Sequence, residues 1–191
     1  GKGAETVNTL ELVNRSISPY TSVLEGGFLR GLVATYALSP KLTTTIFLSS
    51  LNQDANIRQG AEETFENYFS SVQLSGFHRT ATEIENRNSV NEKLYGIELH
   101  YQNNSRNRLG IIAAVNKFSL PILRSDRPYN AFEFSGQENF NLSLFGNTYW
   151  QRARFFSEVA ISKSGGIGSL MGLTSPLSKR IDFGMIMRNY N

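Results

Sequence analysis

The residues best suited to acid–base or metal chemistry are the two histidines, His78 and His100. Glu98 lies two residues before His100, so an extended strand places both side chains on one face. A protein zinc site needs at least three ligands, and the surrounding sequence offers no third one. No serine lies in a nucleophile-elbow context that indicates a Ser-His-Asp arrangement. We therefore expect a polar contact between His100 and Glu98, and no catalytic residue, metal site or cofactor.

The densest glycine cluster is Ser164-Gly165-Gly166-Ile167-Gly168. A loop that cradles a phosphate needs a following helix and usually a lysine. The residues that follow this cluster, Ser169-Leu170-Met171-Gly172, are typical of a strand instead. The cluster therefore predicts a hairpin loop. The carboxylate pair Glu62-Glu63 lies in polar sequence, and we expect it on the solvated surface.

The composition excludes several classes of protein. The 191 residues are 40% hydrophobic, 12% aromatic and 18% charged, and the charged fraction is below the ~25% of ordinary soluble domains. Since there is no cysteine, a disulfide scaffold, a thiolate metal site and a cysteine nucleophile are excluded. The net charge is +3, and no basic run is longer than Lys179-Arg180, so the charge pattern does not indicate nucleic-acid binding.

A strand is clearest at 93–102, where side chains alternate in polarity. The odd-numbered residues from Tyr95 to Tyr101 are apolar, whereas Glu98 and His100 lie on the other face. The same pattern, with Pro, Asn and Gly at the joints, predicts eight strands: Phe28–Leu38, Leu42–Ser50, Lys93–Gln102, Arg108–Phe118, Phe132–Phe145, Gln151–Lys163, Ser169–Thr174 and Arg180–Tyr190.

Short and long connections alternate between the predicted strands. The short ones are Ser39–Lys41, Asn103–Asn107, Gly146–Trp150 and Ser175–Lys179, and the longer ones are Leu51–Glu92, Ser119–Ala131 and Ser164–Gly168. Short periplasmic turns on one rim and longer extracellular loops on the other are typical of outer-membrane barrels.

The connection at 51–92 is predicted to be a long extracellular loop with a short helix. Thr80 or Thr82 could cap a helix over Glu83–Arg87. Ser71–Phe77 is typical of a short strand. The alternative is an ordinary connection in a soluble domain. A loop of this length, rich in polar and aromatic residues, suits a surface that docks other outer-membrane proteins.

Alternation alone does not identify the solvent outside the sheet. A soluble sandwich turns its apolar face inward, whereas a membrane barrel turns it toward lipid. Aromatic residues at strand ends and strands of about nine to eleven residues favour the barrel. The charged residues predicted to face the lumen are Arg30, Glu98, Arg152, Arg154, Glu158, Asp182 and Arg188. The residues predicted to face lipid are Tyr95, Ile97, Leu99, Tyr101, Phe155, Val159 and Ile161.

A series of short motifs carries a more specific signal. In chain order these are Gly1-Lys2-Gly3-Ala4-Glu5, Ser18-Pro19-Tyr20-Thr21-Ser22, Phe28-Leu29-Arg30-Gly31, Ser75-Gly76-Phe77-His78-Arg79-Thr80, Glu83-Ile84, Arg127-Pro128-Tyr129-Asn130, Gly165-Gly166 and Arg188-Asn189-Tyr190. With them the chain resembles the barrel portion of helix-hairpin-helix domain-containing outer-membrane proteins of Gram-negative bacteria. The resemblance implies an outer-membrane β-barrel with more than eight strands, of which this chain is one arc. The helix-hairpin-helix segment itself is absent, so no DNA-binding role is carried over.

We therefore expect an all-β fold: an antiparallel transmembrane β-barrel, or an arc of a larger one, with about eight strands. Residues 1–191 are expected to form a single barrel segment and to be a fragment of a longer chain. The rival geometry is a closed eight-strand barrel filled by side chains. The expected function is a structural, transport or envelope-assembly component of the outer membrane without catalytic activity, with membrane lipid as its partner. The alternative is a soluble all-β binding module such as a lectin-like sandwich.

Overall fold

The computed structural model describes residues 20, 27–59, 67–124 and 133–190, and these residues form an all-β fold. The strands are β1 (Gly31–Ser39), β2 (Leu42–Gln59), β3 (Asn67–Gln73), β4 (Val90–Gln102), β5 (Arg108–Ile122), β6 (Gly136–Trp150), β7 (Ala153–Ser162), β8 (Ile167–Pro176) and β9 (Asp182–Tyr190). One short helix, α2 (Ala81–Glu85), lies between β3 and β4.

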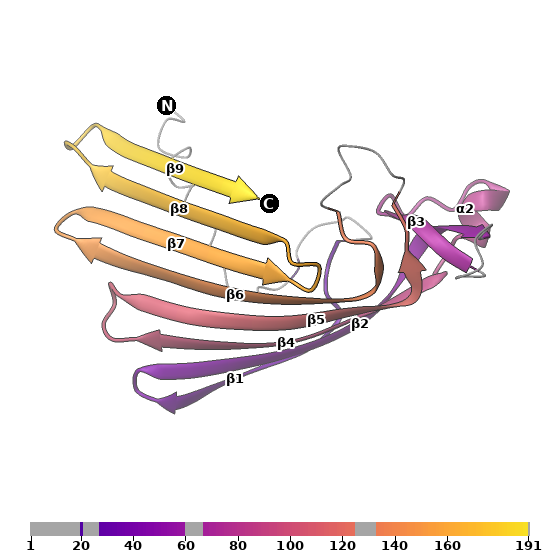
Figure 1. Ribbon diagram of the computed structural model, residues 1–191, viewed down its shortest axis with the longest axis horizontal. Coiled ribbons are helices and arrows are strands. Elements are labelled where there is room, and N and C mark those ends of the chain that lie inside the picture. The colour runs from indigo at the N-terminus through magenta and orange to yellow at the C-terminus, as the bar shows by residue number, and fades with distance from the viewer. Residues whose placement is uncertain (1–19, 21–26, 60–66, 125–132, 191) are drawn as a thin grey trace.

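Eight of these strands form one curved sheet in the order β1-β2-β4-β5-β6-β7-β8-β9 (Figure 1). Every neighbouring pair along this order is antiparallel. Within the described residues, β1 pairs only with β2 and β9 pairs only with β8. The described sheet therefore has two free edges and does not close as an eight-strand barrel.

β3 closes a small barrel at one end of this sheet. It pairs antiparallel with the end of β2 and makes one parallel bridge to β5, Phe69 to Ile122. Because β4 joins β2 to β5 on the other side, the strands β2, β3, β5 and β4 form a ring. The parallel bridge makes the sheet mixed, which corrects the expectation of a purely antiparallel fold.

The ring encloses the hydrophobic core of the described structure. Ala55, Phe69, Val90 and Ile122 are buried there. Phe118 and Phe134 pack against this cluster; both were expected at the ends of the apolar face. The core is small and local, because most other large apolar side chains of the sheet are exposed.

The paired residues divide the sheet into two faces. The inner face, continuous with the interior of the small barrel, carries the row Thr35, Thr45, Glu98, Ile112, Ser143, Ala160 and Gly168. The outer face carries the adjacent row Ala34, Ile46, Ile97, Ala113, Leu142, Ile161 and Ile167. Because side chains alternate along each strand, these two rows fix the faces of the other paired residues as far as the register shifts before Ser39, Ile57 and Ile122.

Several boundaries differ from the sequence prediction. The interval 51–92 is only partly loop, because β2 runs on to Gln59, β3 occupies Asn67–Gln73 and β4 begins at Val90. The predicted turn Gly146–Trp150 is the end of β6, and the turn lies at Gln151 and Arg152. The predicted helix is confirmed within α2 and is capped by Thr80.

Three phenylalanine rings lie flat on glycines of the neighbouring strand. Phe47 pairs with Gly96, Phe145 with Gly110, and Phe156 with Gly172, all on the inner face. A Cβ atom added to these glycines would lie 2.1, 2.3 and 2.0 Å, respectively, from the Cζ atom of the ring. Each ring therefore occupies the space that a side chain at the glycine would fill, and it covers the exposed backbone of the glycine.

Replacing Gly96 with alanine tests this packing. We expect Gly96→Ala to lower the free energy of unfolding by about 1–3 kcal/mol, because the new methyl group displaces the Phe47 ring. The measurement is urea unfolding of the purified protein. In the double variant with Phe47→Ala the two costs should not add, because the clash has been removed. Additive costs would mean that the ring and the glycine do not share this space.

Candidate functional site

The inner face carries a buried ionic contact between β4 and β5. Arg108 Nη2 lies 2.8 Å from Glu98 Oε1, and His100 Nδ1 lies 3.2 Å from the same oxygen. Glu98 is only 9% exposed. The expected contact between Glu98 and His100 is present. The third side chain at this contact is the cation Arg108, which is not a metal ligand. The described residues contain no group of three or more His, Cys, Asp or Glu side chains that could hold a metal ion.

Further polar contacts follow the inner face in both directions. Glu92 accepts hydrogen bonds from Gln53 and from Asn116 Nδ2, the latter at 2.7 Å. Ser143 donates a hydrogen bond to Glu158 at 2.6 Å. Inward carboxylates thus meet donors from adjacent strands, which offsets the cost of partly burying their charge.

The register places most of the predicted charged residues on this one face. Glu98, Arg154, Glu158, Asp182 and Arg188 are all inner-face positions. Two of the predicted residues are not on strands: Arg30 lies just before β1, and Arg152 lies in the turn after β6. Both had been assigned to strands that begin later than predicted, at Gly31 and Ala153.

The residues predicted to face lipid all lie on the opposite, outer face. The list is Tyr95, Ile97, Leu99, Tyr101, Phe155, Val159 and Ile161. All seven are exposed. Tyr149, one of the aromatic residues near strand ends, pairs instead with Arg154 on the inner face, and the guanidinium lies 5.9 Å from its ring centre.

A polar cavity of about 430 Å³ lies where β2 leaves the open sheet and enters the small barrel. Arg30 and Phe28 reach it from the segment before β1, and His78 and Arg87 from the segments on either side of α2. β2, β3 and β4 contribute mainly hydroxyl and amide groups, from Ser50, Asn52, Gln53, Gln73 and Asn91. Sequence reasoning missed this cavity, because its walls come from four separate parts of the chain.

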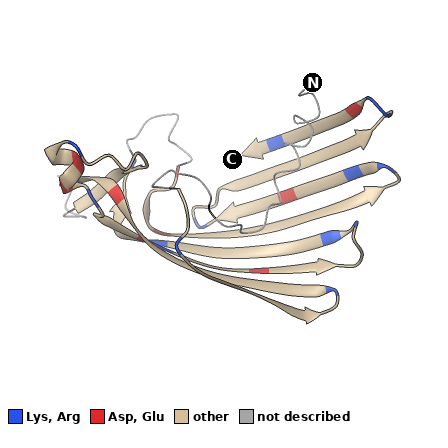
Figure 2. Ribbon diagram, turned by 180° about the vertical axis from the view of Figure 1, so that it is seen from behind, with Lys and Arg blue, Asp and Glu red and all other residues tan. Residues whose placement is uncertain are grey.

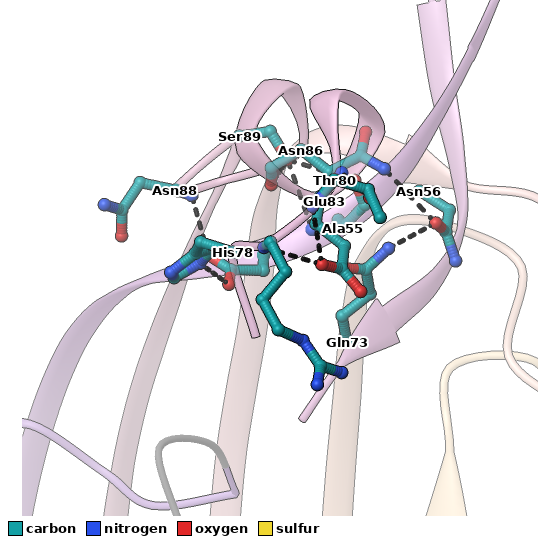
Figure 3. A network of polar contacts seen from close by, with 11 residues as sticks. Ala55, Asn56, Gln73, His78, Thr80, Glu83, Asn86, Asn88 and Ser89 are labelled. Carbon is teal, nitrogen blue, oxygen red and sulfur yellow. Dashed lines mark hydrogen bonds and ion pairs between the residues drawn. The ribbon is translucent and has the colours of Figure 1, made fainter. Parts of the chain in front are cut away.

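Asp54 lies in one wall of the cavity, and its two partners, His78 and Asn88, are labelled in the polar network of Figure 3. Its Oδ2 atom lies 2.6 Å from His78 Nε2, and its Oδ1 atom accepts the backbone N–H of Asn88 at 2.8 Å. Asn88 has a positive φ of 51°, a conformation that asparagine tolerates better than most residues. Both carboxylate oxygens of Asp54 are therefore engaged in holding the connection between β3 and β4 against β2.

A second set of hydrogen bonds attaches the same connection to the backbone of β2. The N–H of Ala55 donates to Asn86 O and to Ser89 Oγ, both at 3.2 Å. The buried Asn86 side chain donates to Asn56, which also accepts from Gln73 at 2.5 Å. This network consists of amides, a hydroxyl and backbone groups, and it positions the loop against β2.

Helix α2 begins with a reciprocal cap. Glu83 N–H donates to Thr80 Oγ1 at 3.2 Å, while the Glu83 carboxylate accepts the backbone N–H groups of Arg79 and Thr80 at 2.8 and 3.0 Å. These bonds satisfy backbone donors that a helix start leaves unpaired. They also hold the pKa of Glu83 below its ordinary value, because the backbone N–H groups of Arg79 and then of Thr80 favour the ionised carboxylate.

The glycine cluster lies where a hairpin loop was expected. Its first residues form the turn between β7 and β8, with Gly165 at a φ of +84°, and its last two begin β8. A strand follows the cluster, as predicted, so the cluster opens no helix. Glu62-Glu63 and the motif Arg127–Asn130 lie outside the described residues.

No family model, curated protein or solved structure matches this chain. Among the described residues, no helix is both long enough and apolar enough to cross a membrane.

The cap of α2 predicts a pH response. Because the pKa of Glu83 is lower in the folded chain, its stabilising effect is complete above the ordinary glutamate pKa of 4.5. It is lost as the pH falls through the lowered value. We expect hydrogen exchange at the amides of Ile84 and Asn86, which bond back to Thr80 and Thr82, to accelerate below pH 4.5 relative to the core of the small barrel.

Glu83→Gln should remove most of this pH response, since the amide cannot ionise. Glu85→Gln is the matched control on the same helix, because Glu85 makes none of the cap hydrogen bonds. An equal effect of both variants would show that the response does not come from the cap.

Proposed function

We propose that this chain is an arc of an outer-membrane β-barrel, with its outer face in contact with lipid. It would act as a structural, transport or envelope-assembly component. The observation that carries the proposal is the outer face of the sheet, where apolar side chains are exposed on each of the eight strands β1, β2 and β4 to β9. Examples are Leu32 at 76%, Leu144 at 53% and Met187 at 61% exposed.

The apolar band has a polar margin at one end. Lys93, Lys117 and Glu138 form one cross-strand row on the outer face, and Lys117 Nζ lies 2.8 Å from Glu138 Oε2. From this row to the hairpin turns, the outer-face residues of β4, β5 and β6 include no charged side chain. Figure 2 shows how few charged positions lie in the middle of the sheet. An uncharged band bounded by charged groups is the surface expected of a strand array in hydrocarbon.

The soluble alternative requires the apolar side chains to meet in a dry interior. In the part of the chain that the structure describes, such an interior exists only in the small barrel, around Ala55, Phe69, Val90 and Ile122. Soluble monomers rarely expose apolar patches larger than a few hundred Å², whereas here such residues cover a face of eight strands. This contrast favours lipid over water outside the sheet.

The two free edges favour an arc over a complete small barrel. β1 contains no charged residue and no proline, and β9 contains only Asp182 and Arg188 as charged residues. Soluble proteins usually protect such edges with charges, prolines or bulges. In hydrocarbon an unpaired strand edge is not tolerated. We therefore propose that further strands cover β1 and β9 and complete a larger barrel, as the resemblance to helix-hairpin-helix outer-membrane proteins implies.

An arginine scan of the two faces tests the membrane assignment. We expect Leu144→Arg to destabilise the protein in lipid vesicles by about 2–4 kcal/mol, because the charge enters the hydrocarbon. Asn141→Arg is the matched control, since Asn141 is exposed on the inner face of the same strand. This control should cost no more than about 0.5 kcal/mol. Urea unfolding in vesicles measures both values.

In a soluble sandwich both substitutions fall on exposed positions, so both should be tolerated and the protein should stay monodisperse without detergent. That result would contradict the membrane assignment.

Hydrogen exchange in lipid tests whether the edges are covered. If further strands pair with β1 and β9, the amides of these strands should be as protected as those of β5, which is paired on both sides. If the edges are free, alternate amides of β1 and β9 should exchange quickly while β5 stays protected. The second pattern, seen in the natural full-length protein, would contradict the arc.

A further inference from the structure

The polar cavity between β2 and the α2 segment has an excess of positive side chains. Arg30 and Arg87 line it, and Asp54 is the one carboxylate among its lining residues. Both oxygens of Asp54 are already engaged, by His78 Nε2 and by the N–H of Asn88. Among the described residues this carboxylate forms its ion pair with His78 and with neither guanidinium.

The two arginines have no carboxylate partner among the described residues. The ion pairs of that part of the chain involve other groups, and Arg30 contacts instead the ring of Phe28 at 5.7 Å. A guanidinium offers five donors in a planar fork that matches an oxyanion such as phosphate. Two such groups at one cavity are suited to one doubly charged anion.

The remaining lining suits hydroxyl groups. Asn52, Gln53, Asn88 and Asn91 contribute amides, and Ser50 contributes a hydroxyl. Each amide offers both donors and acceptors. Asn91 Nδ2 donates to Asn52 Oδ1 at 2.7 Å, so these two side chains hold each other in place at the wall. A wall of fixed amides favours a ligand that carries several hydroxyls over an apolar one.

We propose that this cavity binds a phosphorylated sugar or cyclitol. The phosphate lies against Arg30 and Arg87, and the hydroxyl-bearing ring lies against the amides of β2 and β4. The volume of about 430 Å³ is within the ~300–1,000 Å³ of small-molecule sites. The site does not depend on the membrane assignment, because none of the residues used here belongs to the apolar band of the outer face.

The probe for this site is inositol 1-phosphate, titrated calorimetrically into the detergent-folded protein. We expect saturable binding, weaker binding of inorganic phosphate, and weaker binding of inositol. Arg30→Gln and Arg87→Gln should each weaken the binding of inositol 1-phosphate about ten- to a hundredfold, since each removes a charge-assisted hydrogen bond. Arg180→Gln, in the turn between β8 and β9, is the matched control and should leave the affinity unchanged.

The outcomes separate the proposal from its rivals. Equal losses in all three variants would indicate general attraction to positive charge and would overturn the site. The proposal would also be overturned if Arg30→Gln and Arg87→Gln left the binding unaffected. The same holds if inositol 1-phosphate does not bind to a protein whose α2 segment has native hydrogen-exchange protection. If inorganic phosphate binds as tightly as inositol 1-phosphate, the sugar part of the proposal is wrong.

Two sources can supply this head group: a free sugar phosphate and a lipid. Dibutanoyl phosphatidylinositol carries the same ring with short acyl chains, but its phosphate is a diester with a single negative charge. Tighter binding of this compound than of inositol 1-phosphate, lost in the same arginine variants, would support the site with a lipid as its ligand. Equal or weaker binding would support it with the free compound. The titrations test the cavity in detergent, whereas the arginine scan tests the membrane assignment in vesicles. A failure to bind the phosphate compounds therefore does not affect the result of the arginine scan.

Discussion

One pairing register, continuous from β1 to β9, determines what each side of the sheet presents. Directly paired residues share a face, so a row that begins at Ala34 passes through Ile46, Ile97 and Ala113 to Ile167 without crossing to the other side. A slip of one residue at any pair would send Glu98 or Glu158 outward and isoleucines inward. The apolar outer face and the polar inner face are therefore one property of the fold, set by backbone hydrogen bonds.

Side chains on the inner face must pack in a more confined space than those on the outer face. The charged groups of the inner face are partly removed from water. Rings lie on glycines, as Phe145 does on Gly110, and the buried Glu98 carboxylate finds Arg108 on the next strand. Phe145 is directly opposite Gly110, and Arg108 lies four residues along β5 from Ile112, the residue opposite Glu98. The pairing register that exposes the apolar outer face therefore also brings the rings onto the glycines and the carboxylate near the arginine on the inner face.

The faces were predictable because alternation is local, but the closure of the small barrel was not. β3 joins β2 and β5 through contacts such as Phe69 with Ile122, and no local pattern specifies so distant a partner. The turn after β6 was misplaced for a related reason. Gly146 is typical of a turn but pairs with Leu109 inside a strand, while Gln151 adopts the positive φ that the turn requires. The polar cavity likewise combines residues as distant as Arg30 and Arg87.

The size of the dry core makes the surroundings of the sheet part of its stability. The core cluster of four buried residues lies at one end, and the hairpins from β6 to β9 extend beyond it (Figure 1). Those hairpins bury little apolar area against the rest of the described chain, since residues such as Met171 and Met185 remain exposed. In water the hydrophobic effect stabilises a fold only through the apolar surface area that folding removes from solvent. The outer face gains this contribution only when another apolar medium covers it, so under the proposed lipid contact the fold of these strands and their surroundings would have one physical cause.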